Sequence, residues 1–115
     1  MTLPKIQHPS LKDQYISYGF FTRQGGVSKQ PFNSLICSFN VNDEQNDIKA
    51  NLKLVCQELQ LKKLMKLNQI HSSKVHIINN RDNHESILNA DGLVTNLKSI
   101  GLSILGADCA PILFY

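Results

Sequence analysis

Apolar residues recur at helical spacing in one segment of the chain. They follow steps of four, three, one and three at Ile48, Leu52, Val55, Cys56 and Leu59. This spacing places them on one face of an α-helix, which should pack on a sheet while Lys49 and Lys53 stay exposed. We therefore predict a helix over Asp43–Leu59, with Asn42 or Asp43 as its N-cap and acidic residues in its first turn.

The rest of the chain shows short apolar, aromatic or β-branched runs separated by turn-forming residues, a pattern typical of strands. The predicted strands cover Tyr15–Thr22, Leu35–Val41, Leu64–His71, Lys74–Asn79, Gly92–Thr95, Ser99–Leu105 and Ile112–Tyr115. A polar loop is expected over Asn79–Asn89. Residues 1–13 are polar and interrupted by two prolines, which indicates a surface arm. One helix with six or seven strands predicts the α+β class.

Length and composition limit the kind of protein. A chain of 115 residues with 42% hydrophobic and 18% charged residues predicts one folded domain and argues against disorder. No apolar run approaches the about 18 residues of a membrane span, and the N-terminus lacks the apolar core of a signal peptide. The net charge of +3 is too small and too scattered for a nucleic-acid-binding surface. An odd count of three cysteines without a Cys-x-x-Cys pair indicates a reducing compartment, so we expect a cytoplasmic protein.

The end of the chain allows two interpretations. It stops within an apolar, strand-like run, Ile112–Tyr115. This run is either a last edge strand at the surface or a sign that the chain is the front part of a longer, incomplete domain. In the second case, the exposed apolar edge should favour self-association or binding to a complementing fragment.

Few residues stand where chemistry is expected. Cys109 follows an acidic residue at a break between two apolar runs, and His71 ends a predicted strand beside a turn. Arg23 directly precedes the turn formed by Gly25 and Gly26, where backbone N–H groups and a guanidinium can bind an anion. The simpler interpretation of each is a solvated turn residue. The remaining cysteines are expected in the core, two histidines (His8 and His84) in solvent, and His76 within a strand.

Taken together, these positions lie in sequence blocks that resemble those of the YfiH-type family, whose members carry laccase-domain or polyphenol-oxidase labels. Two blocks cover residues 19–28 (GFFTRQGGVS) and 107–113 (ADCAPIL). Between them lie Ser34-Leu35, Asn42-Asp43, Asn51, Gln69-Ile70-His71 with Val75, and residues 90–95 (ADGLVT). The order of the blocks is that of the family, and together they extend from about Tyr18 to Tyr115.

The resemblance implies an α/β sandwich with a mixed sheet, of which this chain would be the N-terminal part. It implies a metal-dependent enzyme that phosphorolyses adenosine, inosine and methylthioadenosine and deaminates adenosine. Its metal, zinc with copper as the other candidate, would be held by His71, Cys109 and a histidine of a later His-Ala-Gly-Trp block. This sequence has no such block. Arg23, Gly25 and Gly26 are our candidates for binding phosphate beside the purine nucleoside.

Some residues depart from the family pattern, and alternatives to its activity stay open. Ile36, Asn42 and Leu52 stand where the family usually has Asn, Gly and Arg. One alternative is an inactive, truncated remnant of the family. Another is a hydrolase with Cys109 as nucleophile and His71 as base. Multicopper oxidation is the least favoured interpretation, because such sites need many histidines and this chain has four.

Overall fold

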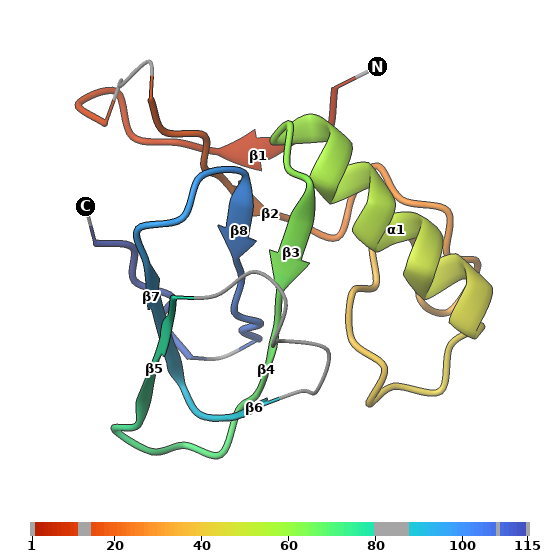
Figure 1. Cartoon of the computed structure of the whole chain (residues 1–115). Coiled ribbons are helices and arrows are strands. Elements are labelled where there is room, and N and C mark those ends of the chain that lie inside the picture. Colours follow the sequence, from red (N-terminus) through yellow and green to blue (C-terminus); the bar gives the residue numbers. More distant parts are fainter. Residues whose placement is uncertain (1, 12–14, 80–87, 108, 115) are drawn as a thin grey trace. The chain divides into compact units, whose positions relative to one another are not determined.

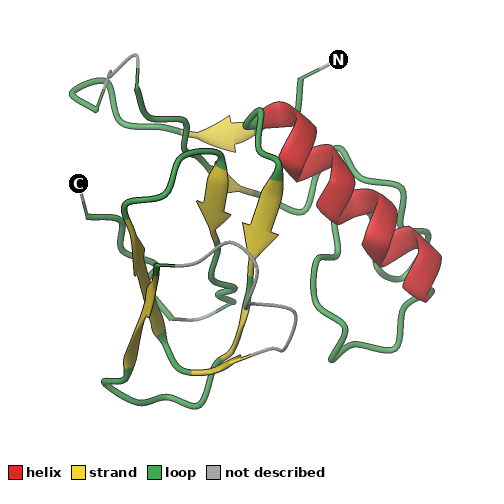
Figure 2. Cartoon of the chain, viewed as in Figure 1, coloured by secondary structure: helices red, strands yellow, loops and turns green. Residues whose placement is uncertain are grey.

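The computed structural model describes residues 2–11, 15–79, 88–107 and 109–114. The chain divides into two compact units, residues 1–61 and 62–115. The described residues form one α-helix and eight short strands joined by long loops (Figure 1 and Figure 2). This mixture confirms the α+β class. None of the helical structure described is both long and apolar enough to cross a membrane.

Helix α1, Gln45–Glu58, dominates the first unit and confirms the predicted helix to within two residues at each end. Its buried positions are Ile48, Asn51 and Val55, so a polar residue takes the centre of the inward face. The predicted apolar positions Leu52, Cys56 and Leu59 are half-buried.

The predicted N-cap was wrong by one or two residues. The N-cap is Glu44, which has extended backbone angles and makes no capping hydrogen bond with its side chain. The Asp43 carboxylate instead accepts the Glu44 N–H at 2.8 Å, and this short-range bond leaves the helix to begin one residue later.

The N-terminal segment is more than a surface arm. Leu3 is buried, and strand β1, Lys5–Ile6, pairs antiparallel with β2, Phe20–Phe21. Glu58, at the end of α1, accepts the Leu3 N–H at 3.2 Å and forms an ion pair with Lys5. Residues 2–6 are thus part of the first unit's core and sheet, whereas residues 1 and 12–14 of the predicted arm lie outside the described residues.

The strand predicted over Leu35–Val41 is absent from the structure, where these residues form loops and turns. The reason lies in their backbone groups. Leu35 N–H donates to the Arg23 carbonyl at 2.8 Å, and the Ile36 carbonyl accepts from the Asn51 side chain at 2.9 Å. Contacts that close a loop have replaced those of a strand ladder.

Three parallel strand pairs build the second unit. Strand β3, Lys63–Met65, pairs with β8, Ile100–Leu102, and β4, Leu67–Asn68, pairs with β6, Leu88–Asn89. Strand β5, Val75–Ile78, lies beside β7, Gly92–Thr95 (Figure 1). The buried apolar side chains of this unit are Met65, Leu67, Ile78 and Ala90.

The second unit confirms β7 at its predicted bounds and shortens the other predicted strands. Leu88–Asn89 pairs as β6, although we expected it in a polar loop; the Asn68 amide donates to the Asn89 side chain across this pair at 2.8 Å. Residues 112–114 lie in no strand, because no partner strand pairs with them among the residues that the structure describes. Tyr115 is outside the described residues.

Candidate functional site

His71 lies in the connection between β4 and β5, in an unusual backbone conformation. Its φ is 57°, in the left-handed region that residues other than glycine seldom adopt. The residue is exposed. A neighbouring carboxylate stabilises this turn, because Asp91 Oδ1 accepts the His71 N–H at 2.9 Å.

The Asp91 carboxylate binds three consecutive residues of that turn. Besides the His71 N–H, it accepts the Ser72 N–H and the Ser72 hydroxyl, each at 2.7 Å, and the Ile70 N–H at 3.1 Å. Desolvation acts to raise the pKa of Asp91, but the hydrogen bonds from Ser72, His71 and Ile70 outweigh it. The pKa therefore lies below the usual range of an aspartate, and the carboxylate is ionised near neutral pH.

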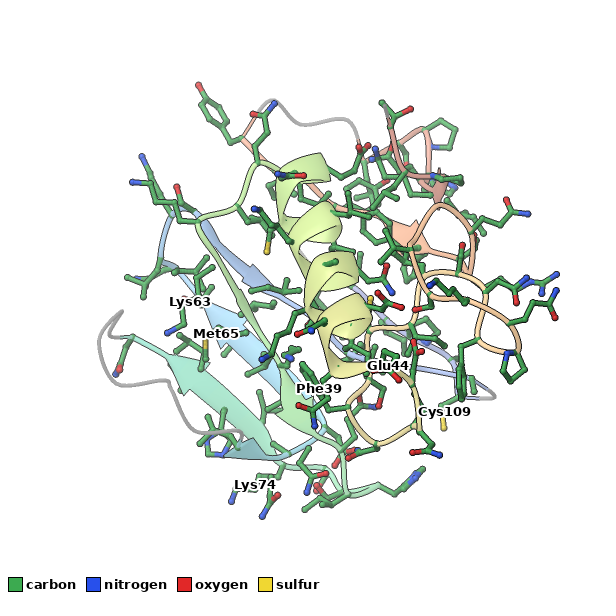
Figure 3. The ribbon with its side chains drawn as sticks, turned by 90° about the vertical axis from the view of Figure 1, so that its right-hand side faces the viewer. Phe39, Glu44, Lys63, Met65, Lys74 and Cys109 are labelled. Atoms are coloured by element: carbon green, nitrogen blue, oxygen red, sulfur yellow. The ribbon has the colours of Figure 1, made fainter. Side chains whose placement is uncertain are left out.

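Cys109 follows β8 and is an exposed free thiol; Figure 3 labels its side chain. The backbone that leads toward it is tied to the His71 segment. The Gln69 side chain donates to the Leu105 carbonyl at 2.8 Å and accepts the Leu105 N–H at 2.7 Å. His71 comes two positions after Gln69 and Cys109 comes four positions after Leu105, so the two candidate ligands follow segments that one carboxamide joins.

The ligand chemistry of this pair fits a metal in kind. Imidazole nitrogen and thiolate sulfur are donors that zinc and copper accept. Within residues 2–11, 15–79, 88–107 and 109–114, no three His, Cys, Asp or Glu side chains gather into a group that could hold an ion. In the described part of the chain, His71 and Cys109 are therefore two donors of the right type. Other groups would have to fill the remaining coordination positions of a metal ion.

The candidate phosphate-binding residues lie in the first unit, in a loop held by internal hydrogen bonds. The Arg23 carbonyl accepts from the Ser34 N–H, the Leu35 N–H and the Ser34 hydroxyl at 2.7, 2.8 and 3.1 Å. The residue is exposed. Its backbone is therefore fixed at a loop where its side chain faces solvent.

The two glycines of that loop have different roles. Gly25 has a φ of 93°, which L side chains seldom adopt. A Cβ on Gly26 would lie 2.2 Å from the Ser34 carbonyl oxygen and 2.6 Å from Asn51 Oδ1, so no side chain fits. The Gly26 N–H already donates to Ser34 Oγ at 3.1 Å, and a bound anion would compete with that hydroxyl for it.

Asn51 is the residue whose role sequence reasoning missed most clearly. It is fully buried on α1 and binds the loop at four points. Its Oδ1 accepts the Val27 N–H at 2.8 Å, and its Nδ2 donates to Ser28 Oγ, the Ser34 carbonyl and the Ile36 carbonyl at 2.8, 3.2 and 2.9 Å. In the sequence, Asn51 was marked as a member of a family block, and so were Gln69 and Asp91.

A protein-family model described as multi-copper polyphenol oxidoreductase laccase matches residues 17–115. Among curated proteins, the chain is similar to purine nucleoside phosphorylase YlmD of Bacillus subtilis, with 32% identity over 106 residues. That alignment covers 84% of this chain and 38% of the relative. The chain thus spans well under half the length of this relative.

Two solved structures resemble the chain. A Neisseria meningitidis protein, described as a DUF152 family protein, has a TM-score of 0.76 and 26% identity, and the match covers 95% of this chain and 43% of that one. The hypothetical protein YfiH of Bacillus licheniformis has a TM-score of 0.63 and 26% identity, over 73% of this chain and 36% of that one.

Proposed function

Because the chain belongs to the multi-copper polyphenol oxidoreductase laccase family, which includes YfiH-like proteins, we propose that it serves as a zinc-dependent purine nucleoside phosphorylase. Its proposed substrates are adenosine, inosine and methylthioadenosine, with phosphate as co-substrate and deamination of adenosine as a second reaction. The observation that carries the proposal is the Gln69–Leu105 pair of hydrogen bonds, because it joins the segments of the two candidate ligands.

In this proposal, His71 and Cys109 are two ligands of the zinc ion. A zinc ion bound through such donors supplies Lewis acidity to its site. In this proposal, the chain's own contribution would be to bring an imidazole and a thiol to one ion from two segments that a pair of hydrogen bonds joins. Phosphorolysis also requires phosphate beside C1′ of the ribose, and we propose that the Arg23 guanidinium binds it, with Gly25 and Gly26 shaping the loop.

The metal ligands can be tested with cobalt(II), which replaces zinc and reports a thiolate ligand through its charge-transfer absorption. We expect the chain to show this absorption with excess cobalt and to lose it in Cys109→Ala. His71→Ala should weaken cobalt binding. Cys56→Ala is the matched control, because Cys56 is half-buried on α1 and burial raises the pKa of its thiol.

Activity requires a second assay, with each nucleoside, phosphate and zinc. We expect turnover to depend on zinc, to be lost in Cys109→Ala, and to need more phosphate in Arg23→Ala. Lys29→Ala, which removes an exposed cation of the same unit, should leave the phosphate requirement unchanged. Turnover that survives metal chelation would favour a hydrolase with Cys109 as nucleophile. A chain that neither binds cobalt nor turns over a nucleoside would favour an inactive remnant of the family.

A further inference from the structure

The turn that carries His71 is held by the carboxylate of Asp91. Its Oδ1 accepts the His71 N–H at 2.9 Å and the Ile70 N–H at 3.1 Å. Its Oδ2 accepts the Ser72 N–H and the Ser72 hydroxyl at 2.7 Å each, and the Ile70 N–H at 3.3 Å. Successive N–H groups that converge in this way form a concave anion-binding nest, and here the anion belongs to the chain itself.

Asp91 is well placed to act as a fixed anchor. The residue before it, Ala90, is fully buried and donates its N–H to the Asn68 carbonyl at 3.2 Å. The Asp91 N–H donates to the Lys74 carbonyl at 3.0 Å, and β7 begins at the next residue. The carboxylate is therefore attached to the second unit's core through its own backbone.

This anchor acts on the backbone of His71 and leaves its imidazole free. Three N–H donors fixed to one carboxylate determine the orientation of the peptide groups on both sides of His71. They also compensate for its left-handed φ of 57°. The direction in which the imidazole leaves the backbone is thus set before any ligand binds.

A second side chain binds the segment that precedes the other candidate ligand. Gln69 binds both backbone polar groups of Leu105, and Ser103, two residues earlier, donates its N–H and its hydroxyl to the Met65 carbonyl at 3.0 and 2.9 Å. These contacts extend the parallel pairing of β3 and β8 beyond the strand ends. The backbone up to Leu105 is therefore hydrogen-bonded to the segment that precedes His71.

We propose that Asp91 and Gln69 are positioning residues that preorganise His71 and Cys109 for metal binding. The inference rests on the proposed function, because it assigns these two side chains to that site. Asp91 sets the His71 backbone, and Gln69 sets the spacing between the two ligand-bearing segments. Neither side chain needs to touch the ion.

The test uses the full 115-residue chain and has a readout that needs no metal. In amide hydrogen exchange measured by NMR, the N–H groups of Ile70, His71 and Ser72 should be protected. We expect Asp91→Ala to remove this protection while leaving that of Ile78, a buried residue of β5, intact. Cobalt affinity, measured by chelator competition, should fall by about 10- to 100-fold in Asp91→Ala, the usual effect of losing a partner behind a metal ligand.

Chemical rescue separates positioning from a general loss of structure. Formate is a carboxylate small enough to occupy the space that Asp91→Ala vacates, so added formate should restore both the amide protection and part of the cobalt affinity. The wild-type chain in the same formate corrects for binding of cobalt by formate. Gln69→Glu should also weaken cobalt binding, since a carboxylate can accept the Leu105 N–H but cannot donate to its carbonyl. Asp47→Asn, in the first turn of α1, is the matched control and should bind cobalt as the wild type does.

The outcomes distinguish this inference from the proposed function. If the wild-type chain binds cobalt through its thiolate and Asp91→Ala binds it equally well, positioning by Asp91 is wrong and the metal site stands. Equal affinity in Gln69→Glu overturns the role of Gln69 in the same way. If the wild-type chain gives no thiolate–cobalt absorption, the proposed function itself fails, and the positioning role fails with it.

Discussion

At the scale of single residues, a buried polar side chain holds one of this protein's loops in place through hydrogen bonds. Asn51 illustrates this, because its carboxamide donates and accepts at four points of one loop while no part of the residue reaches solvent. A buried amide contributes most when every polar atom is paired, and losing one partner leaves the others unsatisfied.

Asn51→Asp tests this role with the smallest possible change in shape. An aspartate has no donor for the Ser34 and Ile36 carbonyls, so we expect the free energy of unfolding to fall by about 1–3 kcal/mol. Urea denaturation measures the change. Asn46→Asp is the matched control, because Asn46 is exposed near the start of α1 and its replacement should be nearly neutral. An equal effect of the two variants would contradict the role assigned to Asn51.

Gly26→Ala tests how closely the same loop packs. The new Cβ would meet backbone and side-chain atoms at 2.2–2.6 Å, which neither can avoid without breaking hydrogen bonds. We expect a lower melting temperature and loss of protection of the Val27 N–H. In Gly19→Ala, by contrast, the nearest atom at 2.7 Å belongs to the flexible Lys5 side chain, so this control should be much milder. Matching melting temperatures for the two variants would disprove the steric argument.

At the scale of elements, the sequence predicted those that rest on their own periodicity. Helix α1 has enough apolar steps to be recognised, and β7 is bounded by turn-forming residues. Periodicity could not identify Asn51 as the centre of the buried face, since polar residues are assigned to solvent by default. Nor could it show that the backbone of Leu35 and Ile36 bonds to Arg23 and Asn51 instead of a strand.

The same reasoning explains which parts of the candidate site the sequence revealed. His71 and Cys109 have side chains whose chemistry is recognisable in any sequence. Asp91 and Gln69 act on backbone groups of residues that are distant along the chain, and no local pattern identifies that partnership. The positions were visible as motif members, and the structure supplies their contacts.

The burial of α1 predicts unequal effects along its apolar face. Ile48 is 1% exposed, so Ile48→Ala should lower the free energy of unfolding by about 2–5 kcal/mol. Leu52 is half-buried, and Leu52→Ala should cost clearly less. Equal losses in chemical denaturation would show that the helix is rotated from the orientation described.

The connection between β1 and α1 predicts a pH dependence. The hydrogen bond from Lys5, supported by that from Leu3, holds the pKa of Glu58 below its usual value, against the opposing effect of desolvation. Because the folded-state pKa is depressed, this contribution is present above the ordinary glutamate pKa of about 4.3 and is lost as pH falls through the lower, folded-state pKa. Glu58→Gln should flatten that part of the stability curve measured by thermal melting at stepped pH. An unchanged acid limb would contradict the assignment.

At the scale of the whole molecule, the described residues leave apolar surface exposed, and two parts of the second unit illustrate this. On the β5–β7 pair, Val75, Ile77 and Val94 are 57%, 70% and 49% exposed, although parallel strands are usually covered on both faces. Near the end of the chain, Ile112 and Phe114 are 63% and 92% exposed. Contiguous apolar surface of this kind favours association with a second copy.

We therefore expect the 115-residue chain to self-associate with rising concentration, as sedimentation velocity can measure. Ile77→Lys should reduce association if the β5–β7 face carries it, and Phe114→Lys should do so if the last apolar residues carry it, as their sequence suggested. Val27→Lys introduces the same charge at a 44% exposed position of the first unit and should change little. A wild-type chain that stays monomeric throughout would rule out both surfaces.

The hydrogen bonds between Asp91 and the His71 turn also determine which sequences this turn can tolerate. The carboxylate bonds to main-chain N–H groups, which nineteen of the twenty amino acids possess, and it takes nothing from the side chain of Ile70. Almost any amino acid can therefore occupy position 70, where Ile70 is 47% exposed. Proline alone is barred there, because it has no N–H to offer. A related sequence can thus differ at this position and still present its histidine in the same way.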